Sequence, residues 1–321
     1  MRRFAAVDLG SLTVRLAVAE LTGPEKFKIL GHYREVTGLG AGLAQGDTLA
    51  PEDMARTFKA LEGFVQVLRA QGVEVSRVVA TQALRQARNR EVLVRRVQED
   101  LRLPVQILSP EEEARTSLKG VLSALAPEVL EAPELVVFDV GGGSSEWALI
   151  RRGQEAKFAS LPLGVLTLSR SRPLGDPPRP EAVAALQGEI ERRLEEFYRQ
   201  TLQPHLTTTP CLVGTAGAVT TLAALALVLS PYDASRVNNL LLTRGQVAAL
   251  AELLCRLSAA DRARLPGMEP AKAGVMVAGA LIILTILQIF QQDSLVVIDA
   301  GLLEGVLGEM AAEFGRGDRG Q

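Results

Sequence analysis

Short apolar runs alternate with longer amphipathic stretches along most of the chain. The runs are rich in Val, Ile, Leu and Phe, which is typical of buried strands, whereas the longer stretches repeat apolar residues at helical spacing. The alternation predicts an α/β protein with a largely parallel sheet after an antiparallel opening. Strands are expected at 4–7, 26–35, 75–80, 105–108, 135–138, 156–161, 211–213 and 295–299, and helices at 51–71, 81–102, 110–125, 181–203, 214–229, 244–257, 270–290 and from 302 onward.

Residues 135–150 contain a glycine turn between two strands. Asp139 ends an apolar run, three glycines and two serines follow, and the sequence then returns to a strand pattern. Glycines can adopt positive φ and let main-chain N–H groups approach a ligand. A carboxylate beside such a turn suits a magnesium-bound phosphate, because the amides meet phosphate oxygens and the acid meets the cation. An ordinary hairpin with a flexible turn is the alternative.

A second copy of this pattern opens the chain. In residues 4–19, Asp8 follows an apolar run, Gly10 and Ser11 come next, and another strand follows. Two related hairpins favour a duplicated domain with a phosphate held between the halves. The 321 residues are enough for two domains of ordinary size, which we place at 1–125 and 126–301, with the helix 302–321 able to pack back on the first.

Composition excludes several classes of function. Hydrophobic residues make up 47% of the chain and charged residues 22%, so each half can bury a core. The formal net charge is −2 and no run of Lys or Arg exceeds two residues, which argues against a nucleic-acid surface. Only two histidines are present, which disfavours a histidine zinc site or a Ser-His-Asp triad. Cys211 and Cys255 lack metal-ligand spacing and are expected to be buried thiols in a reducing cytoplasm.

One segment requires a test for membrane insertion. Residues 273–290 approach the roughly 20 apolar residues that a spanning helix needs. Thr285, Gln288 and the strand pattern that follows favour a buried helix instead, serving the core or a homodimer contact. The apolar segment 4–7 is too short for a secretory signal. No membrane association is therefore expected.

Polar residues outside the glycine turns add candidate chemistry. Three glutamates follow Ser109 and Pro110, where a cap, a first-turn proline and acids at the positive end of a helix would explain them without any function. Arg85 follows a strand and could bridge phosphate oxygens, or be a solvated helix residue. Arg15 lies on a short apolar strand and needs either an anion or an edge position. Glycines at 214 and 217 again lie between a strand and a helix N-terminus.

Four motifs occur in order along the chain, and they are Asp8-Leu-Gly-Ser11 with Arg15, residues 81–87, residues 109–115, and Asp139-Val-Gly-Gly-Gly-Ser-Ser-Glu146. Together they resemble the motifs of the exopolyphosphatase and guanosine pentaphosphate phosphatase (Ppx/GppA) family, in the actin, Hsp70 and sugar kinase superfamily. The resemblance covers essentially the whole chain and implies the short form with two actin-like, ribonuclease H-like domains, mixed sheets flanked by helices, and a cleft between them.

The resemblance also implies roles for individual residues. Glu113 would orient or activate the attacking water. Mg²⁺, or another divalent cation, would be held by Asp8, Asp139 and Glu146, directly or through waters. The phosphates would be held by Ser11, Arg15, Arg85, Gly141, Gly142, Gly143 and Ser144. These groups would supply positioning and charge neutralisation, which phosphoryl transfer to water mainly requires.

The chain departs from the family pattern at five polar positions, which are Leu12, Thr167, Ala218, Gly274 and Leu303. Because the catalytic and metal residues are retained, we expect a cytoplasmic, magnesium-dependent exopolyphosphatase acting on inorganic polyphosphate. Guanosine pentaphosphate is the alternative substrate. An ATP-dependent kinase of the same superfamily is a second alternative, and it would leave the motif at 109–115 unexplained. A phosphate or nucleotide sensor with weak catalysis, suggested by the five departures, is the third.

Overall fold

The computed structural model describes residues 2–23, 25–44 and 46–317 and separates the chain into two compact units. The N-terminal unit comprises the described residues up to Ser123 together with those from Ala300 onward. The second unit is Ala124–Asp299. The chain therefore leaves the first unit and returns to it with its last helix.

A five-stranded sheet forms the centre of the N-terminal unit, in the order β3-β2-β1-β4-β5. The first two strands form an antiparallel hairpin in which Asp8 lies opposite Arg15. β1 then pairs in parallel with β4, and β4 with β5. The strands are β1 (Arg3–Leu9), β2 (Thr13–Gly23), β3 (Lys26–Val36), β4 (Val75–Ala80) and β5 (Val105–Ile107).

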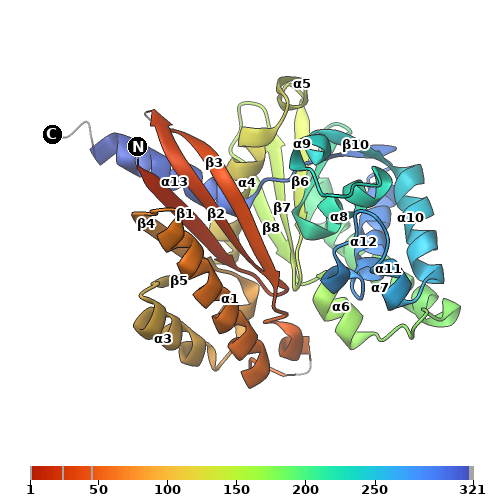
Figure 1. Ribbon diagram of the computed structural model, residues 1–321. Coiled ribbons are helices and arrows are strands. Elements are labelled where there is room, and N and C mark those ends of the chain that lie inside the picture. Colours follow the sequence, from red (N-terminus) through yellow and green to blue (C-terminus); the bar gives the residue numbers. More distant parts are fainter. Residues whose placement is uncertain (1, 24, 45, 318–321) are drawn as a thin grey trace. The chain divides into compact units, whose positions relative to one another are not determined.

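Helices cover both faces of this sheet (Figure 1), because β1 is apolar on both sides. One core joins Val7, Leu9 and Leu16 to α1 (Pro51–Ala70) and α3 (Arg90–Leu101). The other joins the alternate side chains Phe4, Ala6 and Ala17 to α13 (Leu302–Gly317). The unit also contains the short helix α2 (Gln82–Gln86), the 3₁₀ turn Ala41–Ala44, and α4 (Pro110–Ala124), which extends one residue into the second unit.

The second unit repeats this arrangement around a six-stranded sheet. Its order is β8-β7-β6-β9-β11-β10, so an antiparallel hairpin again precedes a parallel neighbour. The strands are β6 (Glu134–Val140), β7 (Ser145–Arg151), β8 (Lys157–Leu161), β9 (Cys211–Thr215), β10 (Leu240–Thr243) and β11 (Ser294–Val297). The hairpins β1–β2 and β6–β7 thus occupy equivalent places in the two sheets.

Helices pack around the second sheet in layers, with α12 contacting α6, α7, α8 and α10. α12 is almost wholly buried, as the sequence predicts for residues 270–290. A search of the described residues finds no helix with the length and apolarity to span a membrane. The helices are α5 (Pro127–Leu130), α6 (Val165–Ser171), α7 (Pro180–Phe197), α8 (Ala216–Ala226), α9 (Ala234–Val237), α10 (Arg244–Arg256), α11 (Ala259–Arg262) and α12 (Met276–Ile289).

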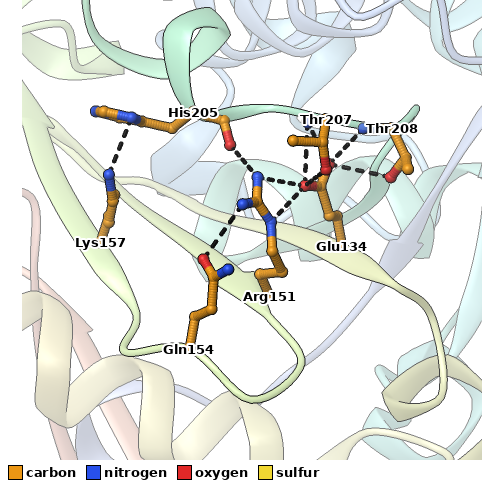
Figure 2. A network of polar contacts seen from close by, with 7 residues as sticks. All are labelled: Glu134, Arg151, Gln154, Lys157, His205, Thr207 and Thr208. Atoms are coloured by element: carbon orange, nitrogen blue, oxygen red, sulfur yellow. Dashed lines mark hydrogen bonds and ion pairs between the residues drawn. The ribbon is translucent and has the colours of Figure 1, made fainter.

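A buried carboxylate fixes the first residue of β6 (Figure 2). Glu134 is 2% exposed and accepts hydrogen bonds from the backbone and hydroxyl groups of Thr207 and Thr208. Arg151, the cross-strand partner of Glu134, donates from Nε at 2.7 Å. Burial raises the pKa of Glu134, but the hydrogen bonds outweigh it and lower the pKa to about 2. This network joins the hairpin to the loop before β9.

Four local expectations are wrong. The α-helix expected at 270–290 begins only at Met276 and is preceded by a 3₁₀ turn at Pro270–Lys272. The helix expected at 81–102 is broken, because the backbone of Ala87 is extended and the Asn89 side chain exchanges two hydrogen bonds with the backbone of Leu49. The α-helix expected at 181–203 becomes a π-helix at Tyr198–Leu202 and a 3₁₀ turn at Gln203–His205. Cys211 and Cys255 are half-buried rather than buried, and this partial burial raises the pKa of both thiols.

Candidate active site

The first turn carries a buried carboxylate at the end of β1. Asp8 is 3% exposed, and its Oδ2 accepts hydrogen bonds from Nε and Nη2 of Arg15 at 3.0 and 2.7 Å. The sequence left two explanations for an arginine on this apolar strand, an anionic partner or a place at the sheet edge. β2 is an interior strand, so the anionic partner, Asp8, is the explanation. Asp8 Oδ1 is buried and has no hydrogen-bond partner within the described residues. An unpaired buried carboxylate oxygen is costly, so this atom is suited to accept a cation or a ligand donor.

The backbone of the first turn is held by its carbonyl groups. Gly10 N–H donates to Thr13 O at 3.0 Å, which closes the turn. The carbonyl oxygens of Ser11 and Leu12 accept from the loop after β3, where Gly40 N–H donates to Ser11 O at 2.8 Å. In the described part of the chain, the N–H groups of Ser11 and Leu12 have no acceptor. They remain available to the oxygens of an anion.

The second turn repeats this design in the other unit. Gly141 N–H donates to Ser144 O at 3.0 Å, the counterpart of the bond from Gly10. The carbonyl oxygens of Gly141 and Gly142 accept from the first residues of α6, with Leu166 N–H at 2.8 Å from Gly142 O. The Gly142 N–H has no acceptor among the residues the structure describes. Each unit thus has a turn held by its carbonyls with an amide left for a ligand.

The glycines serve a different purpose from the one the sequence suggests. None of Gly10, Gly141, Gly142 and Gly143 has positive φ, so conformational freedom is not the reason for them. A Cβ on Gly10 would lie 2.9 Å from Thr13 O, and one on Gly141 would lie 3.2 Å from Ser144 O. At Gly10 and Gly141 the reason for glycine is therefore the close approach of backbone to backbone.

Glu113 lies in the first turn of α4. Its Oε2 accepts from Nη1 of Arg85 at 2.8 Å, and the same guanidinium donates to Leu108 O at 2.8 Å. The two side chains are 14% and 20% exposed, respectively. The structure therefore brings together two predicted site residues from different motifs. It also rules out the alternative that Arg85 is a solvated helix residue.

The neighbouring glutamates explain why only Glu113 takes this position. Glu112 forms a capping box with Ser109, and these hydrogen bonds lower the pKa of Glu112. Glu111 forms an exposed ion pair with Arg115, one helical turn later. Glu111 and Glu112 therefore have the purely structural roles that the sequence allows for glutamates at a helix start. Glu113 does not, because it pairs with Arg85 instead.

Asp139 and Glu146 lie opposite each other on β6 and β7. Glu146 is 5% exposed, and its Oε1 accepts from the hydroxyls of Ser144 at 2.6 Å and Ser160 at 3.1 Å. Within the described residues, no group of three or more His, Cys, Asp or Glu side chains is placed to hold a metal. Mg²⁺ nevertheless prefers oxygen ligands such as carboxylates, and the unpaired Asp8 Oδ1 could bind a Mg²⁺ ion.

Two polar residues near the first turn are absent from the predicted site. Gln82 is 7% exposed and accepts from the Ser11 hydroxyl at 3.3 Å. Glu304 on α13 accepts from Gly301 N–H at 2.7 Å. Burial raises the pKa of Glu304, opposed by that hydrogen bond and by His32 and Arg15. The sequence signal that could have indicated Glu304 is its place as a lone acid between the apolar residues at the start of α13.

Comparison with known proteins identifies the family. The model of the Ppx/GppA phosphatase family matches residues 17–314. A protein of Mycobacterium tuberculosis named exopolyphosphatase 2 is 30% identical over 318 residues, which is 95% of this chain and 98% of that one. The chain belongs to the Ppx/GppA family. The resemblance of the four motifs is thereby confirmed.

Solved structures agree with the Ppx/GppA fold. A family member from Aquifex aeolicus has a TM-score of 0.78 and 31% identity, covering 98% of both chains. An exopolyphosphatase from Cytophaga hutchinsonii has a TM-score of 0.86 over 97% of this chain at 22% identity, which supports the fold alone. The predicted actin-like, two-domain α/β fold is confirmed, and the chain is a phosphoanhydride hydrolase of the Ppx/GppA type.

Some departures from the Ppx/GppA pattern have a structural explanation. Leu303 is 3% exposed and lies in the core between α13 and the first sheet. Ala218 is 4% exposed within α8. Thr167 lies at the start of α6, and its hydroxyl donates to Gly164 O at 3.0 Å. The first two substitutions therefore contribute to packing, whereas nothing in the structure explains Gly274.

Proposed function

We propose that the protein removes the terminal phosphate of inorganic polyphosphate by attack of a water molecule. The observation that carries the proposal is the pairing of Glu113 with Arg85 in the unit that also carries the Asp8 turn. A half-buried carboxylate hydrogen-bonded to a guanidinium is held in one orientation, as a group that positions water must be. The relative named exopolyphosphatase 2 supports polyphosphate as the substrate.

The remaining proposed roles follow from the two turns. The free N–H groups of Ser11 and Leu12 would donate to phosphate oxygens in one unit, and that of Gly142 would do so in the other. Ser144, Gly141 and Gly143 would complete the second turn, while Arg15 and Arg85 would add charge. Electrostatic stabilisation of this kind supplies most of the catalysis in phosphoryl transfer.

A divalent cation, which we propose to be Mg²⁺, would be held by Asp8, Asp139 and Glu146. Asp8 offers an unpaired buried oxygen for it, whereas Glu146 Oε1 already accepts two serine hydroxyls and so suits contact through water. When bound, the cation would neutralise charge on the phosphate chain. Chelation should abolish phosphate release, and added Mg²⁺ should restore it.

The substitution Glu113→Gln tests the proposed catalytic residue. The amide keeps the size of the side chain and an acceptor for Arg85 but cannot take a proton from water. We expect kcat for phosphate release from polyphosphate to fall by about 10²–10⁴-fold, with KM little changed. Glu111→Gln, two residues before Glu113 in the same motif and paired with Arg115 in exposed positions, is the matched control and should keep full activity.

Further assays separate the alternatives. Equal rates for wild type and Glu113→Gln would remove Glu113 from its role. Faster phosphate release from guanosine pentaphosphate than from polyphosphate would assign the other substrate of the family. Transfer of phosphate from ATP to a sugar, without polyphosphate cleavage, would favour a kinase. Tight binding of polyphosphate with no turnover in any divalent metal would favour a sensor.

A further inference from the structure

A cavity of about 550 Å³ lies between β3 and α1 in the N-terminal unit, outside the two turns. Its volume falls in the range of small-molecule sites. The apolar part of its lining comes from Tyr33 and Val36 on the strand and from Phe64 and Val67 on the helix. The lining therefore offers an aromatic and aliphatic surface to a ligand.

Small residues on α1 keep this cavity open. Ala60 and Gly63 lie one turn apart on the helix face that lines it. A Cβ on Gly63 would meet nothing within 4 Å. Glycine inside a helix costs roughly 0.5–1 kcal/mol relative to alanine, and here no close contact requires it. The absence of a side chain at Gly63 thus leaves space for a ligand.

The charged part of the lining is mainly cationic, with Arg34, Arg56 and Lys59 against the single carboxylate of Glu35. Arg56 is fixed by two contacts, since Nε donates to Thr37 O at 3.1 Å and Nη2 pairs with the buried Asp53. A guanidinium has five N–H donors, so others remain for a ligand. Lys59 has no anionic partner in the part of the chain that the structure describes.

Thr37 connects this cavity to the first phosphate turn. Thr37 lines the cavity, is 4% exposed, and its hydroxyl has no hydrogen-bond partner among the described residues. Its N–H donates to Leu12 O at 3.0 Å, beside Gly38 N–H at 2.9 Å. The residue that forms one wall of the cavity therefore also holds the turn that carries the amides of Ser11 and Leu12.

We propose that this cavity binds a small organic anion, consisting of an aromatic or similar apolar body with a carboxylate, sulfonate or phosphate group. The apolar body would lie between Tyr33 and Phe64 over Gly63, and the anionic group would meet Lys59 and Arg56. Through Thr37, the bound anion alters the first phosphate turn and hence the affinity for substrate. This last step depends on the proposed function, whereas the binding does not.

Calorimetric titration with naphthalene-1-sulfonate tests the binding. We expect one saturable site per chain, weakened at least tenfold by Gly63→Leu, which fills the cavity, and about fivefold by Lys59→Ala. Gly188→Leu is the matched control, because Gly188 is also an exposed helical glycine with open space around it. Lys26→Ala, at the far end of β3, controls for the loss of a charge. Both controls should bind as the wild type does.

Related probes separate the two parts of the proposed recognition. Naphthalene-1-methanol lacks the charge and inorganic phosphate lacks the ring, so both should bind at least tenfold more weakly than the sulfonate. Absence of saturable binding, or equal affinity in wild type and Gly63→Leu, overturns the site. Equal affinity for inorganic phosphate overturns the requirement for an apolar body.

The link to the turn has a separate readout. Saturating naphthalene-1-sulfonate should change KM for polyphosphate at least twofold in wild type and leave it unchanged in Gly63→Leu, with kcat altered less than KM. Binding without any change in KM overturns the link through Thr37. An inactive wild-type protein that still binds the sulfonate would contradict the proposed function and not the site.

Discussion

Glu134 shows how a single buried carboxylate can be held in its charged form. Thr207 and Thr208 together supply four donor groups, and Arg151 supplies a fifth with the opposite charge. The guanidinium of Arg151 extends the network by donating to His205 O, and Lys157 contacts the ring of His205 (Figure 2). Because Glu134 lies at the opposite end of β6 from Asp139, this network stabilises the hairpin without taking part in its chemistry.

The lowered pKa of Glu134 makes stability depend on pH. Its pKa is 4.5 in the unfolded chain and about 2 in the folded one. The stabilisation is therefore fully present above pH 4.5 and is lost as pH falls through 2. Glu134→Gln should lower the free energy of unfolding by about 1–3 kcal/mol at pH 7, with less loss of stability than wild type between pH 4.5 and 2.

Denaturant unfolding at several pH values measures this effect. Glu128→Gln is the control, since Glu128 is an exposed carboxylate on the neighbouring α5. The free energy of unfolding of the Glu128→Gln variant should equal that of the wild type at every pH. An unchanged pH dependence in Glu134→Gln would show that the network does not hold the charged form.

Two glycines set the distance between α13 and α4, the helix that carries Glu113. A Cβ on Gly305 would lie 1.9 Å from Thr116 O, and one on Gly120 would lie 1.9 Å from Gly301 O. Backbone therefore meets backbone where the last helix returns to the N-terminal unit. The same helix carries Glu304, whose burial raises its pKa and whose pKa the charge of Arg15 in turn lowers. Its close packing thus bears on the position of both Glu113 and the Asp8 turn.

Substitution of these glycines should separate packing from helix propensity. Gly305→Ala forces the two helices apart and should destabilise the protein by about 1–3 kcal/mol. Gly308→Ala, one turn later with no atom within 4 Å of the added Cβ, should be neutral or stabilising by up to about 1 kcal/mol. Thermal unfolding of both variants gives the comparison, and a similar loss in each would contradict the assigned contact.

The sequence predicts elements well where their pattern is local and poorly where distant contacts decide. The hairpins at Asp8 and Asp139 follow from apolar runs around glycine, and the helix cap follows from Ser109 before Pro110. The break after α2 depends on Asn89 binding Leu49, which no local pattern reveals. The site divides in the same way: the motifs indicate Glu113 and Arg85 as candidates, but only the fold shows that they are paired.

At the scale of the whole molecule, each unit carries a serine in its proposed phosphate turn, Ser11 in the first and Ser144 in the second. Ser11 follows Gly10, and Ser144 O accepts the Gly141 N–H that closes the second turn. Each hydroxyl donates to a buried side chain of its own unit, Gln82 for the first and Glu146 for the second. The proposed function requires phosphate contacts from both turns. If those contacts are made to the same substrate, the effects of removing the two hydroxyls depend on each other.

A double-mutant cycle tests this requirement through kcat/KM for polyphosphate. Ser11→Ala and Ser144→Ala should each lower kcat/KM by about tenfold, since each removes about 1–1.5 kcal/mol of hydrogen bonding. The double mutant should lose markedly less than the product of the two effects, because a substrate displaced from one turn gains less from the other. Ser11→Ala combined with Ser171→Ala, whose hydroxyl donates only to Leu168 O on α6, should instead behave additively. Strict additivity of the first pair would mean that the two turns act on the substrate independently, and would contradict the proposed contacts of both turns with the same substrate.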